Sequence, residues 1–272
     1  MNRLLANWKG VVTSAALAAL VFLPGQALAV PVDMELSLVI DVSGSISTSE
    51  FTLQKQGYAN AFLNATIQSN ILSTTNGQLG KIAANVIFFS DAVATRIGWT
   101  LLDSVADINN FAATINGLTR TPPTASSTDI RDGMAVSRGS FTNGFEGTRL
   151  VMDVSGDGTQ NVGCFSAANC AALVQDQRNL SAAAGIQVNG LAIGGQFITN
   201  YYNANVRTAN GFVVSAADFN TFGSAVLDKL GKETAPIPEP GTVLLFGTGL
   251  VGLAAWRMRQ AKKSLISSNR SF

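Results

Sequence analysis

The chain has 272 residues, with 18 basic side chains, 17 acidic side chains and no histidine. The lack of histidine excludes Ser-His-Asp and Cys-His catalysis, and it excludes every metal site that depends on imidazole ligands. Residues 30–235 carry 16 acidic and 11 basic residues. This mildly acidic balance argues against a nucleic-acid partner, because nucleic-acid binders present a basic face.

The first 29 residues have the three parts of a secretory signal peptide. Arg3 and Lys9 form a positively charged start, residues 11–23 are apolar, and Ala27-Leu-Ala29 is a cleavage site of the A-x-A type. An uncleaved anchor helix is the alternative, although the apolar run is short for a bilayer span of about 20 residues. We therefore expect residues 1–29 to direct export of the domain that follows.

Strand-like and helix-like segments alternate between residues 32 and 232. Apolar stretches predict strands at residues 34–40, 82–89, 94–101, 149–154, 186–193 and 211–214. Helical spacing predicts helices at residues 49–68, 104–115, 129–137 and 171–184, and a last helix that opens with a capping box at 215–218 and runs to about 230. This alternation predicts an α/β fold of three layers, in which helices cover both faces of a doubly wound, mostly parallel sheet of six strands.

Residues 236–263 combine a proline-rich stalk, an apolar run and a basic end. The stalk contains Pro238-Glu-Pro240, the apolar run covers residues 242–256, and the basic residues are Arg257, Arg259, Lys262 and Lys263. The basic end favours the cytoplasm, so a short membrane helix here would leave the preceding domain facing outward. This order of parts resembles the PEP-CTERM sorting signal of Gram-negative bacteria. The resemblance implies processing by an exosortase-type protease and a final location at the outer surface or outside the cell.

The predicted organisation therefore has four parts: a signal peptide (1–29), one folded domain (30–235), the sorting signal (236–263) and a tail (264–272). The tail continues past the basic cluster, where such signals usually end. A plain C-terminal membrane anchor is the alternative to a processed signal. Cys164 and Cys170 suit an oxidising compartment, either as a small-loop disulfide or as two free thiols. Without histidine they cannot complete a usual zinc site.

Oxygen-bearing side chains gather where the predicted strands end. The first strand leads into Asp41, Ser43 and Ser45 around Gly44, the 149–154 strand leads to Asp157, and Thr128 precedes the helix that opens near Asp129. Ligands of open α/β sheets bind beyond the carboxyl ends of the strands. Two carboxylates and three hydroxyls there predict a site for a small, hard cation, for which Mg²⁺ is well suited. Alternatively, Asp41 caps the following helix.

Asp41-x-Ser43-x-Ser45 resembles the metal-ion-dependent adhesion site (MIDAS) of von Willebrand factor type A domains, and the order of strands and helices resembles that fold over most of residues 33–231. The resemblance implies that Ser43 and Ser45 bind the metal directly, that Thr128 and Asp157 complete the site with Asp41, and that one edge strand, residues 94–101, is antiparallel. Asp153 competes with Asp157 for the second carboxylate position, but it lies inside the apolar strand. The phrase Val154-Ser-Gly-Asp-Gly158 resembles a bacterial subgroup of obscure function.

The sequence therefore predicts a metal-dependent binding or adhesion module outside the cytoplasm, with Mg²⁺, or Mn²⁺ or Ca²⁺, as the metal. Its expected partner is a protein or extracellular polymer that offers an acidic group to an open coordination position. A structural matrix protein, in which the metal only stabilises the fold, is the alternative. A hydrolase is disfavoured. Haloacid dehalogenase-type phosphatases need a second aspartate where Ser43 stands, and no phosphate loop or pair of base and nucleophile is visible.

Overall fold

The computed structural model describes residues 29–120 and 126–236. Its centre is a six-stranded sheet with the strand order β4-β3-β2-β6-β7-β8. The strands are β2 (Met34–Asp41), β3 (Ile82–Phe89), β4 (Val93–Leu102), β6 (Leu150–Gly156), β7 (Ile186–Ile193) and β8 (Val213–Ala216). All neighbouring strands are parallel except β3 and β4, which are antiparallel. The predicted sheet is therefore confirmed, including its antiparallel edge strand.

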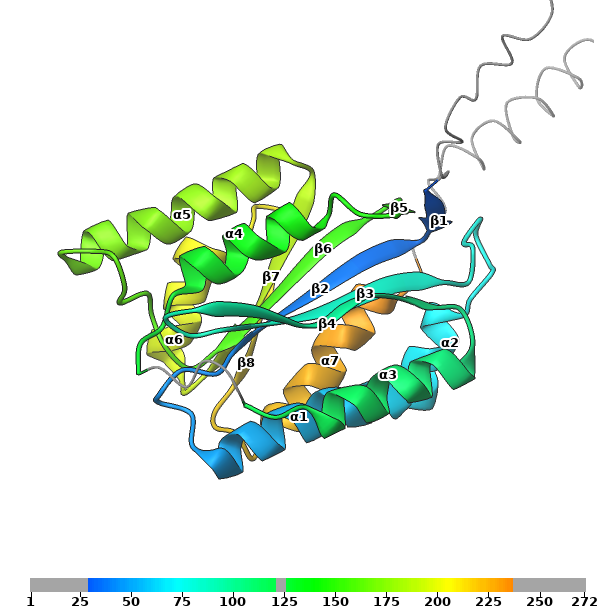
Figure 1. Cartoon of the computed structure of the whole chain (residues 1–272), viewed down its shortest axis with the longest axis horizontal. Coiled ribbons are helices and arrows are strands. Elements are labelled where there is room, and N and C mark those ends of the chain that lie inside the picture. The colour runs from blue at the N-terminus through cyan, green and yellow to red at the C-terminus, as the bar shows by residue number, and fades with distance from the viewer. Residues whose placement is uncertain (1–28, 121–125, 237–272) are drawn as a thin grey trace, which may run out of the picture.

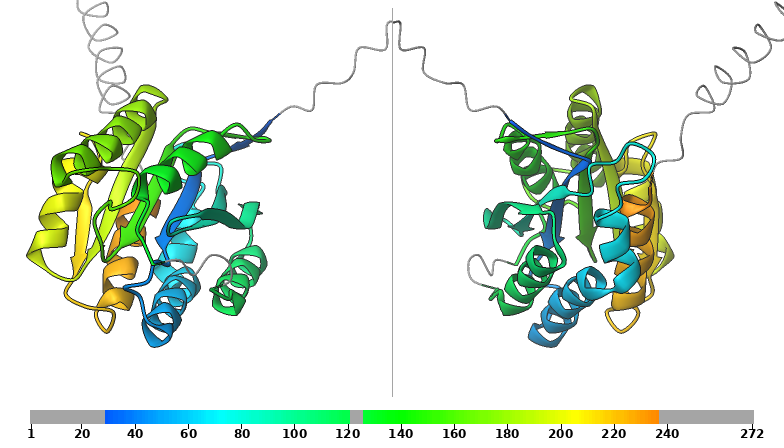
Figure 2. Two further views of the ribbon diagram at one scale, coloured as in Figure 1. Left: turned by 60° about the vertical axis from the view of Figure 1, so that its left-hand side comes forward. Right: turned by 90° about the vertical axis from the view of Figure 1, so that its right-hand side faces the viewer.

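Helices cover both faces of the sheet (Figure 1). One face carries α1 (Thr48–Leu63), α2 (Ala65–Ile71), α3 (Val105–Gly117) and α7 (Phe222–Thr234). The other carries α4 (Ile130–Ser140), α5 (Ala167–Ala183), α6 (Gln196–Tyr201) and the π-helix η1 (Tyr202–Val206). Two apolar cores follow from this arrangement, one on each face, and the further views in Figure 2 show the three layers from the side. The predicted three-layer α/β fold is confirmed.

The two cores follow from the side-chain alternation of the central strand. All eight residues of β2 are buried. Leu36, Leu38 and Ile40 point into the core beneath α1 and α7, whereas Val39 points into the core beneath α4 and α5. Burial on both faces is typical of a parallel strand covered by helices on both sides. Asp41 ends this strand, so the fold delivers a carboxylate to the carboxyl edge of the sheet.

Helix α7 determines where the domain ends relative to that edge. It begins after β8 and runs back along the sheet, so that Glu233 comes within electrostatic range of Arg149, which immediately precedes β6. Thr234 accepts a hydrogen bond from Asn70, 3.3 Å away at the end of α2. The C-terminal end of α7, two residues before the last described residue, Pro236, therefore lies toward the amino end of β6, opposite the strand end that carries Asp41.

Two predicted helices differ in the structure. The predicted 49–68 helix is two helices, because Asn64 leaves the helical conformation and its side chain accepts hydrogen bonds from Thr66 and Ile67 as the cap of α2. The predicted capping box at 215–218 is wrong. Ser215 pairs with Ala192 as part of β8, and α7 begins only at Phe222.

Four elements were not predicted. The pair β1 (Val30–Val32) and β5 (Phe145–Gly147) forms a small parallel ribbon. The other addition is the α6–η1 segment, which follows β7 after Gly194 and Gly195, both at positive φ. Cys164 and Cys170, predicted to form either a disulfide or two free thiols, form a disulfide that joins the loop after β6 to α5.

The membrane-related predictions fall largely outside the described residues. Within residues 29–120 and 126–236, no helix is long and apolar enough to cross a membrane. The signal-peptide segment before residue 29, the apolar run at 242–256 and the tail at 264–272 are not among the residues that the structure describes.

Candidate metal centre

The end of β2 turns sharply over the sheet and fixes the first carboxylate. Asp41 is fully buried, and its Oδ1 atom accepts a hydrogen bond of 2.8 Å from the backbone N–H of Ser43. Gln54 of α1 donates to the Asp41 carbonyl oxygen over 3.1 Å. These contacts hold the strand end from two sides. The Asp41 Oδ2 atom has no hydrogen-bond partner among the described residues.

The five predicted side chains come together at this edge. The Ser43 and Ser45 hydroxyls lie 3.2 Å apart, and Ser45 donates to Asp157 Oδ1 over 2.7 Å. Thr128 donates to the Ser43 hydroxyl over 3.1 Å. Three separate segments therefore supply one continuous chain of side-chain oxygens that runs from Thr128 to Asp157, and Asp41 adjoins it at Ser43.

Three glycines permit this close approach. A Cβ atom on Gly44 would lie 2.9 Å from the Cα atom of Ser126, which begins the described part of the Thr128 loop. A Cβ atom on Gly156 would lie 2.7 Å from Asp41 Oδ2, and one on Gly158 would lie 3.1 Å from the Thr128 hydroxyl. Any larger residue would push the oxygen-bearing segments apart or fill the space between them.

Without a cation, burial disfavours the charged form of both carboxylates, Asp41 and Asp157. Burial raises the pKa of Asp41 to about 7, against hydrogen bonds from Ser43 that lower it, and the nearby Asp157 charge adds to the rise. Burial also raises the pKa of Asp157. Removing a carboxylate from water without a counter-charge is costly. A buried carboxylate without a basic partner, close to Ser43 and to a second carboxylate, is therefore a suitable environment for a divalent cation.

The chemistry of the donor set selects the kind of cation. Within residues 29–120 and 126–236, no three His, Cys, Asp or Glu side chains form a potential metal cluster. A metal here would depend on hydroxyl oxygens as much as on the two carboxylates. Such all-oxygen sites suit Mg²⁺, Mn²⁺ or Ca²⁺ rather than metals that prefer thiolate or imidazole.

A polar network that the sequence did not predict holds the Thr128 segment in place. The Thr128 backbone N–H donates to Asn161 Oδ1 over 2.8 Å, and the Asn161 N–H donates to the Thr128 carbonyl oxygen over 3.1 Å. Gln160 donates to Asp129 over 2.8 Å, and Arg131 pairs with Asp129 at 2.9 Å. The loop after β6 therefore carries both Asp157 and the residues that position Thr128.

Arg120 is a second unpredicted contributor. Its guanidinium donates to the carbonyl oxygens of Val42, over 3.0 Å, and of Ser43. It thus supports the backbone of the β2 loop, and its charge slightly lowers the pKa of Asp41 and Asp157. The only sequence signal was one basic residue at the start of a Thr/Pro-rich loop.

Two other acidic residues are not part of this centre. Asp153, the competitor of Asp157, points to the opposite face of the sheet and forms an ion pair of 2.6 Å with Lys229 of α7. Asp91 is an exposed turn residue between β3 and β4. Asp157, which was preferred over Asp153 as the second carboxylate, is the one that contacts Ser45.

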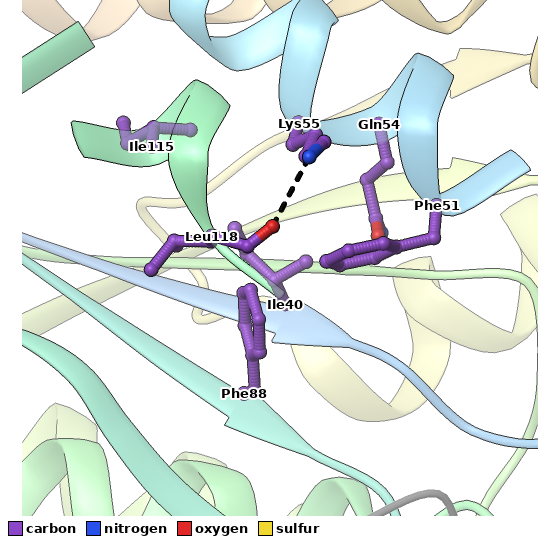
Figure 3. A pocket seen from close by; sticks show the side chains of 7 residues that line it. All are labelled: Ile40, Phe51, Gln54, Lys55, Phe88, Ile115 and Leu118. Carbon is purple, nitrogen blue, oxygen red and sulfur yellow. Dashed lines mark hydrogen bonds between the residues drawn. The ribbon is translucent and has the colours of Figure 1, made fainter. Parts of the chain in front are cut away.

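The apolar crevice between α1 and α3 is a separate feature (Figure 3). Phe51, Phe88 and Ile115 are among its lining residues, and Lys55 crosses its rim to donate to the Leu118 carbonyl oxygen over 3.1 Å. The crevice has no room even for a water molecule. It belongs to the packing between the two helices.

A family model described as "Protein of unknown function (DUF1194)" matches residues 31–238. The chain belongs to this family. A second model, the PEP-CTERM protein-sorting motif, matches residues 236–260. This match confirms the predicted sorting signal and indicates export and sorting to the cell envelope or surface. A search of curated proteins found no match for the DUF1194 chain.

Several solved structures share its fold. Proximal thread matrix protein 1 from the mussel byssus, solved with a zinc-occupied MIDAS motif, is 18% identical with a TM-score of 0.53, and the match covers 75% of this chain and 48% of that one. The pilus adhesin SpaC from Lactobacillus rhamnosus GG is 12% identical with a TM-score of 0.53, over 76% of this chain and 31% of that one. The conserved hypothetical protein BatB from Bacteroides thetaiotaomicron is 14% identical with a TM-score of 0.51, over 73% of this chain and 98% of that one.

The DUF1194 chain thus spans about half or less of the first two of these structures. Identities this low establish a shared von Willebrand factor A-like fold and nothing further about function. The predicted resemblance to that fold is confirmed.

Proposed function

We propose that this chain is an exported binding module whose partner contact is made through a divalent cation held by Asp41, Ser43, Ser45, Thr128 and Asp157. The single observation that carries the proposal is that the Asp41 carboxylate is buried and uncompensated: its Oδ1 atom accepts a neutral backbone N–H, and its Oδ2 atom has no charged partner among the described residues. The carboxylate adjoins a chain of hydroxyls and a second carboxylate. No lysine or arginine pairs with the Asp41 carboxylate in the described residues.

Each residue has a distinct role in this proposal. Asp41 and Asp157 supply the negative charge, and Ser43, Ser45 and Thr128 supply neutral oxygen ligands. Mg²⁺ is the preferred metal, with Mn²⁺ or Ca²⁺ as alternatives, since such ions keep water in positions the protein does not fill. An acidic group of a partner protein or extracellular polymer displaces that water and completes the shell.

The position of the candidate site relative to the sorting signal supports a role in contacts away from the membrane. The sorting motif, matched from residue 236, follows α7, whose C-terminal end lies toward the amino end of β6, opposite Asp41. A domain of residues 30–235 tethered through residues 236–263, by a membrane helix or after exosortase processing, would present the metal edge outward. The site is then free to meet a partner while the chain is still anchored.

A structural matrix role is the second candidate. A matrix protein of the mussel byssus shares the fold and carries zinc at its MIDAS. In this alternative the metal stabilises the domain but does not contact the partner. Binding to the native cell envelope would then survive chelation, whereas the metal-bridged contact would be lost. Hydrolysis of phosphate or ester substrates is the least favoured activity.

The test is a thermal unfolding series of the full chain in mild detergent, with chelator and with increasing Mg²⁺ or Mn²⁺. A ligand that binds only the folded state at 100 times its Kd stabilises it by about 2.7 kcal/mol. We expect a rise in Tm of several degrees in the wild type and none in an Asp41→Ala/Ser43→Ala variant. A wild-type Tm that ignores millimolar Mg²⁺ and Mn²⁺ contradicts the proposal.

A further inference from the structure

A buried tyrosine lies directly behind the candidate metal centre. Tyr202 opens the π-helix η1, which continues from α6, and its side chain is completely buried. Its hydroxyl has no hydrogen-bond partner among the described residues. A buried phenol normally satisfies its O–H group. An unsatisfied one in a well-packed domain therefore calls for a physical explanation.

The position of Gly156 shows where this hydroxyl points. A Cβ atom on Gly156 would lie 2.6 Å from the Tyr202 hydroxyl oxygen and 2.7 Å from Asp41 Oδ2. The two oxygens therefore converge on one small space that only glycine leaves open. One of them is a donor, the other is an acceptor, and each lacks a partner. The other carboxylate oxygen, Asp41 Oδ1, already accepts the Ser43 N–H.

The surrounding contacts hold the phenol in this direction. The Tyr202 ring packs against Gly190 of β7, where a Cβ atom would come within 2.9 Å of the ring. The preceding residue, Tyr201, accepts a hydrogen bond of 3.3 Å from the Gln160 N–H in the loop that carries Asp157. Two consecutive tyrosines thus direct their hydroxyls toward the two carboxylate segments of the centre, Tyr202 toward the space beside Asp41 and Tyr201 toward the loop of Asp157.

We propose that Tyr202 is a positioning residue for Asp41, and this inference rests on the proposed metal-binding function. Its hydroxyl donates to Asp41 Oδ2, directly or through one water, and so orients the carboxylate toward the cation. A phenol is suited to this task because it is neutral. A lysine or arginine at the same place would neutralise Asp41 and compete with the metal, whereas a phenol orients the carboxylate and leaves its charge available. Outer partners of this kind commonly change metal affinity by about 10- to 100-fold.

The chain offers a matched control on the other face of the sheet. Tyr58 of α1 is also completely buried, and its hydroxyl also lacks a hydrogen-bond partner among the described residues. It faces Asp153 and Ser155 rather than Asp41. Tyr202→Phe and Tyr58→Phe therefore remove the same atom from equally buried rings, and only the first removal affects the candidate centre.

The experiment is calorimetric titration of the full chain in mild detergent with Mn²⁺, after removal of metal by chelation. We expect Tyr202→Phe to weaken Mn²⁺ binding by about tenfold and Tyr58→Phe to leave it within twofold. Both variants should unfold in chelator within a few degrees of the wild type. The chain has only three tyrosines, so Mn²⁺ should also produce a tyrosine ultraviolet difference spectrum that Tyr58→Phe retains and Tyr202→Phe loses.

The possible results distinguish the role of Tyr202 from the metal-binding function on which it rests. If the wild type and Tyr202→Phe bind Mn²⁺ equally well, or if Tyr58→Phe loses as much affinity, the role of Tyr202 is refuted while the metal site stands. If the wild type binds no Mn²⁺, the proposed function fails and the inference fails with it.

Discussion

Two buried aspartates lie on opposite faces of the sheet, and they differ in whether a basic side chain pairs with the carboxylate. Asp41 and Asp153 are both inaccessible to solvent, and burial raises the pKa of each to about 7. Asp153 forms an ion pair with Lys229, which also pairs with Glu233 at 2.5 Å. Asn189 completes that cluster by donating to Glu233 over 2.8 Å. Asp41 has only neutral donors on its carboxylate.

The difference between the two regions is whether the fold supplies a positive charge to the buried carboxylate. Lys229 gives the Asp153 cluster its own positive charge, so that region is complete as folded and joins α7 to the sheet. One lysine cannot neutralise two carboxylates, which agrees with the raised pKa of Asp153. In the Asp41 region no lysine or arginine pairs with the carboxylate among the described residues, and the strand ends there at the carboxyl edge of the sheet. We infer that the counter-charge comes from solvent as a metal.

The largest expected effect concerns the internal cation. Lys229→Met removes the ion-pair partner of the buried Asp153 and Glu233, and breaking such a buried pair costs about 3–5 kcal/mol. The measurement is the free energy of unfolding from denaturant titration. The matched control is Lys232→Met in the same helix, because Lys232 and Asp228 are 54% and 53% exposed and surface pairs contribute about 1 kcal/mol or less. Equal losses in the two variants would show that the Lys229 cluster is not structural.

The second-largest expected effect concerns the metal proposed to bind at Asp41. Asp41→Asn removes the charge but keeps the shape, so in chelator above pH 7 the variant should unfold at or above the wild-type Tm. It should lose the stabilisation of about 2.7 kcal/mol expected at 100 times the Kd of Mg²⁺. Asp153→Asn is the same substitution in the other region and should keep that metal-induced shift. If Asp153→Asn abolishes it instead, the two regions have been assigned the wrong way round.

The pH dependence of stability should differ with and without metal. The Asp41 pKa rises from 3.8 to about 7 on folding, so between these values the folded state holds a proton that the unfolded chain has released. In chelator, this group's contribution to stability is therefore greatest at low pH, falls between about pH 4 and pH 7, and is flat above that. Mg²⁺ competes with the proton, so its stabilising effect should grow as the pH rises through 7. Unfolding curves from pH 5 to pH 8 test this, and Asp41→Asn should reduce the decline.

The outline of the metal edge was predictable because parallel strands end at one edge. That rule brought Asp41, Ser43 and Asp157 together from sequence positions more than a hundred residues apart, and the structure has Ser45 and Asp157 in direct contact. The ion pair between Lys229 and Asp153 on the other face of the sheet was not predictable in this way. A lone lysine in an amphipathic helix usually marks the solvent side, yet Lys229 is buried because Asp153 interrupts an apolar strand.

The register of β8 and the position of Tyr202 were not predicted, because no local sequence pattern indicates them. The strand β8 is only four residues long, so hydrophobic alternation did not fix its register, and Ser215 looked like a helix cap. Tyr202 lies in a short π-helix after two glycines, and its relation to Asp41 depends on the space above Gly156. Only packing of distant segments reveals such contacts.

The smallest expected effect comes from removing Arg120, the arginine that contacts the backbone just after Asp41. Arg120 donates to the carbonyl oxygens of Val42 and Ser43 rather than to the carboxylate. Arg120→Met should therefore cost about 1 kcal/mol from lost hydrogen bonds and should leave the Mg²⁺-induced rise in Tm largely intact. If Arg120 were instead the counter-ion of Asp41, in the way that Lys229 serves Asp153, the variant would be destabilised as strongly as Lys229→Met in chelator. Added Mg²⁺ would then rescue it by more than it stabilises the wild type. Parallel unfolding of Arg120→Met and Lys229→Met, each with chelator and with Mg²⁺, distinguishes a residue that supports the loop from one that neutralises the site.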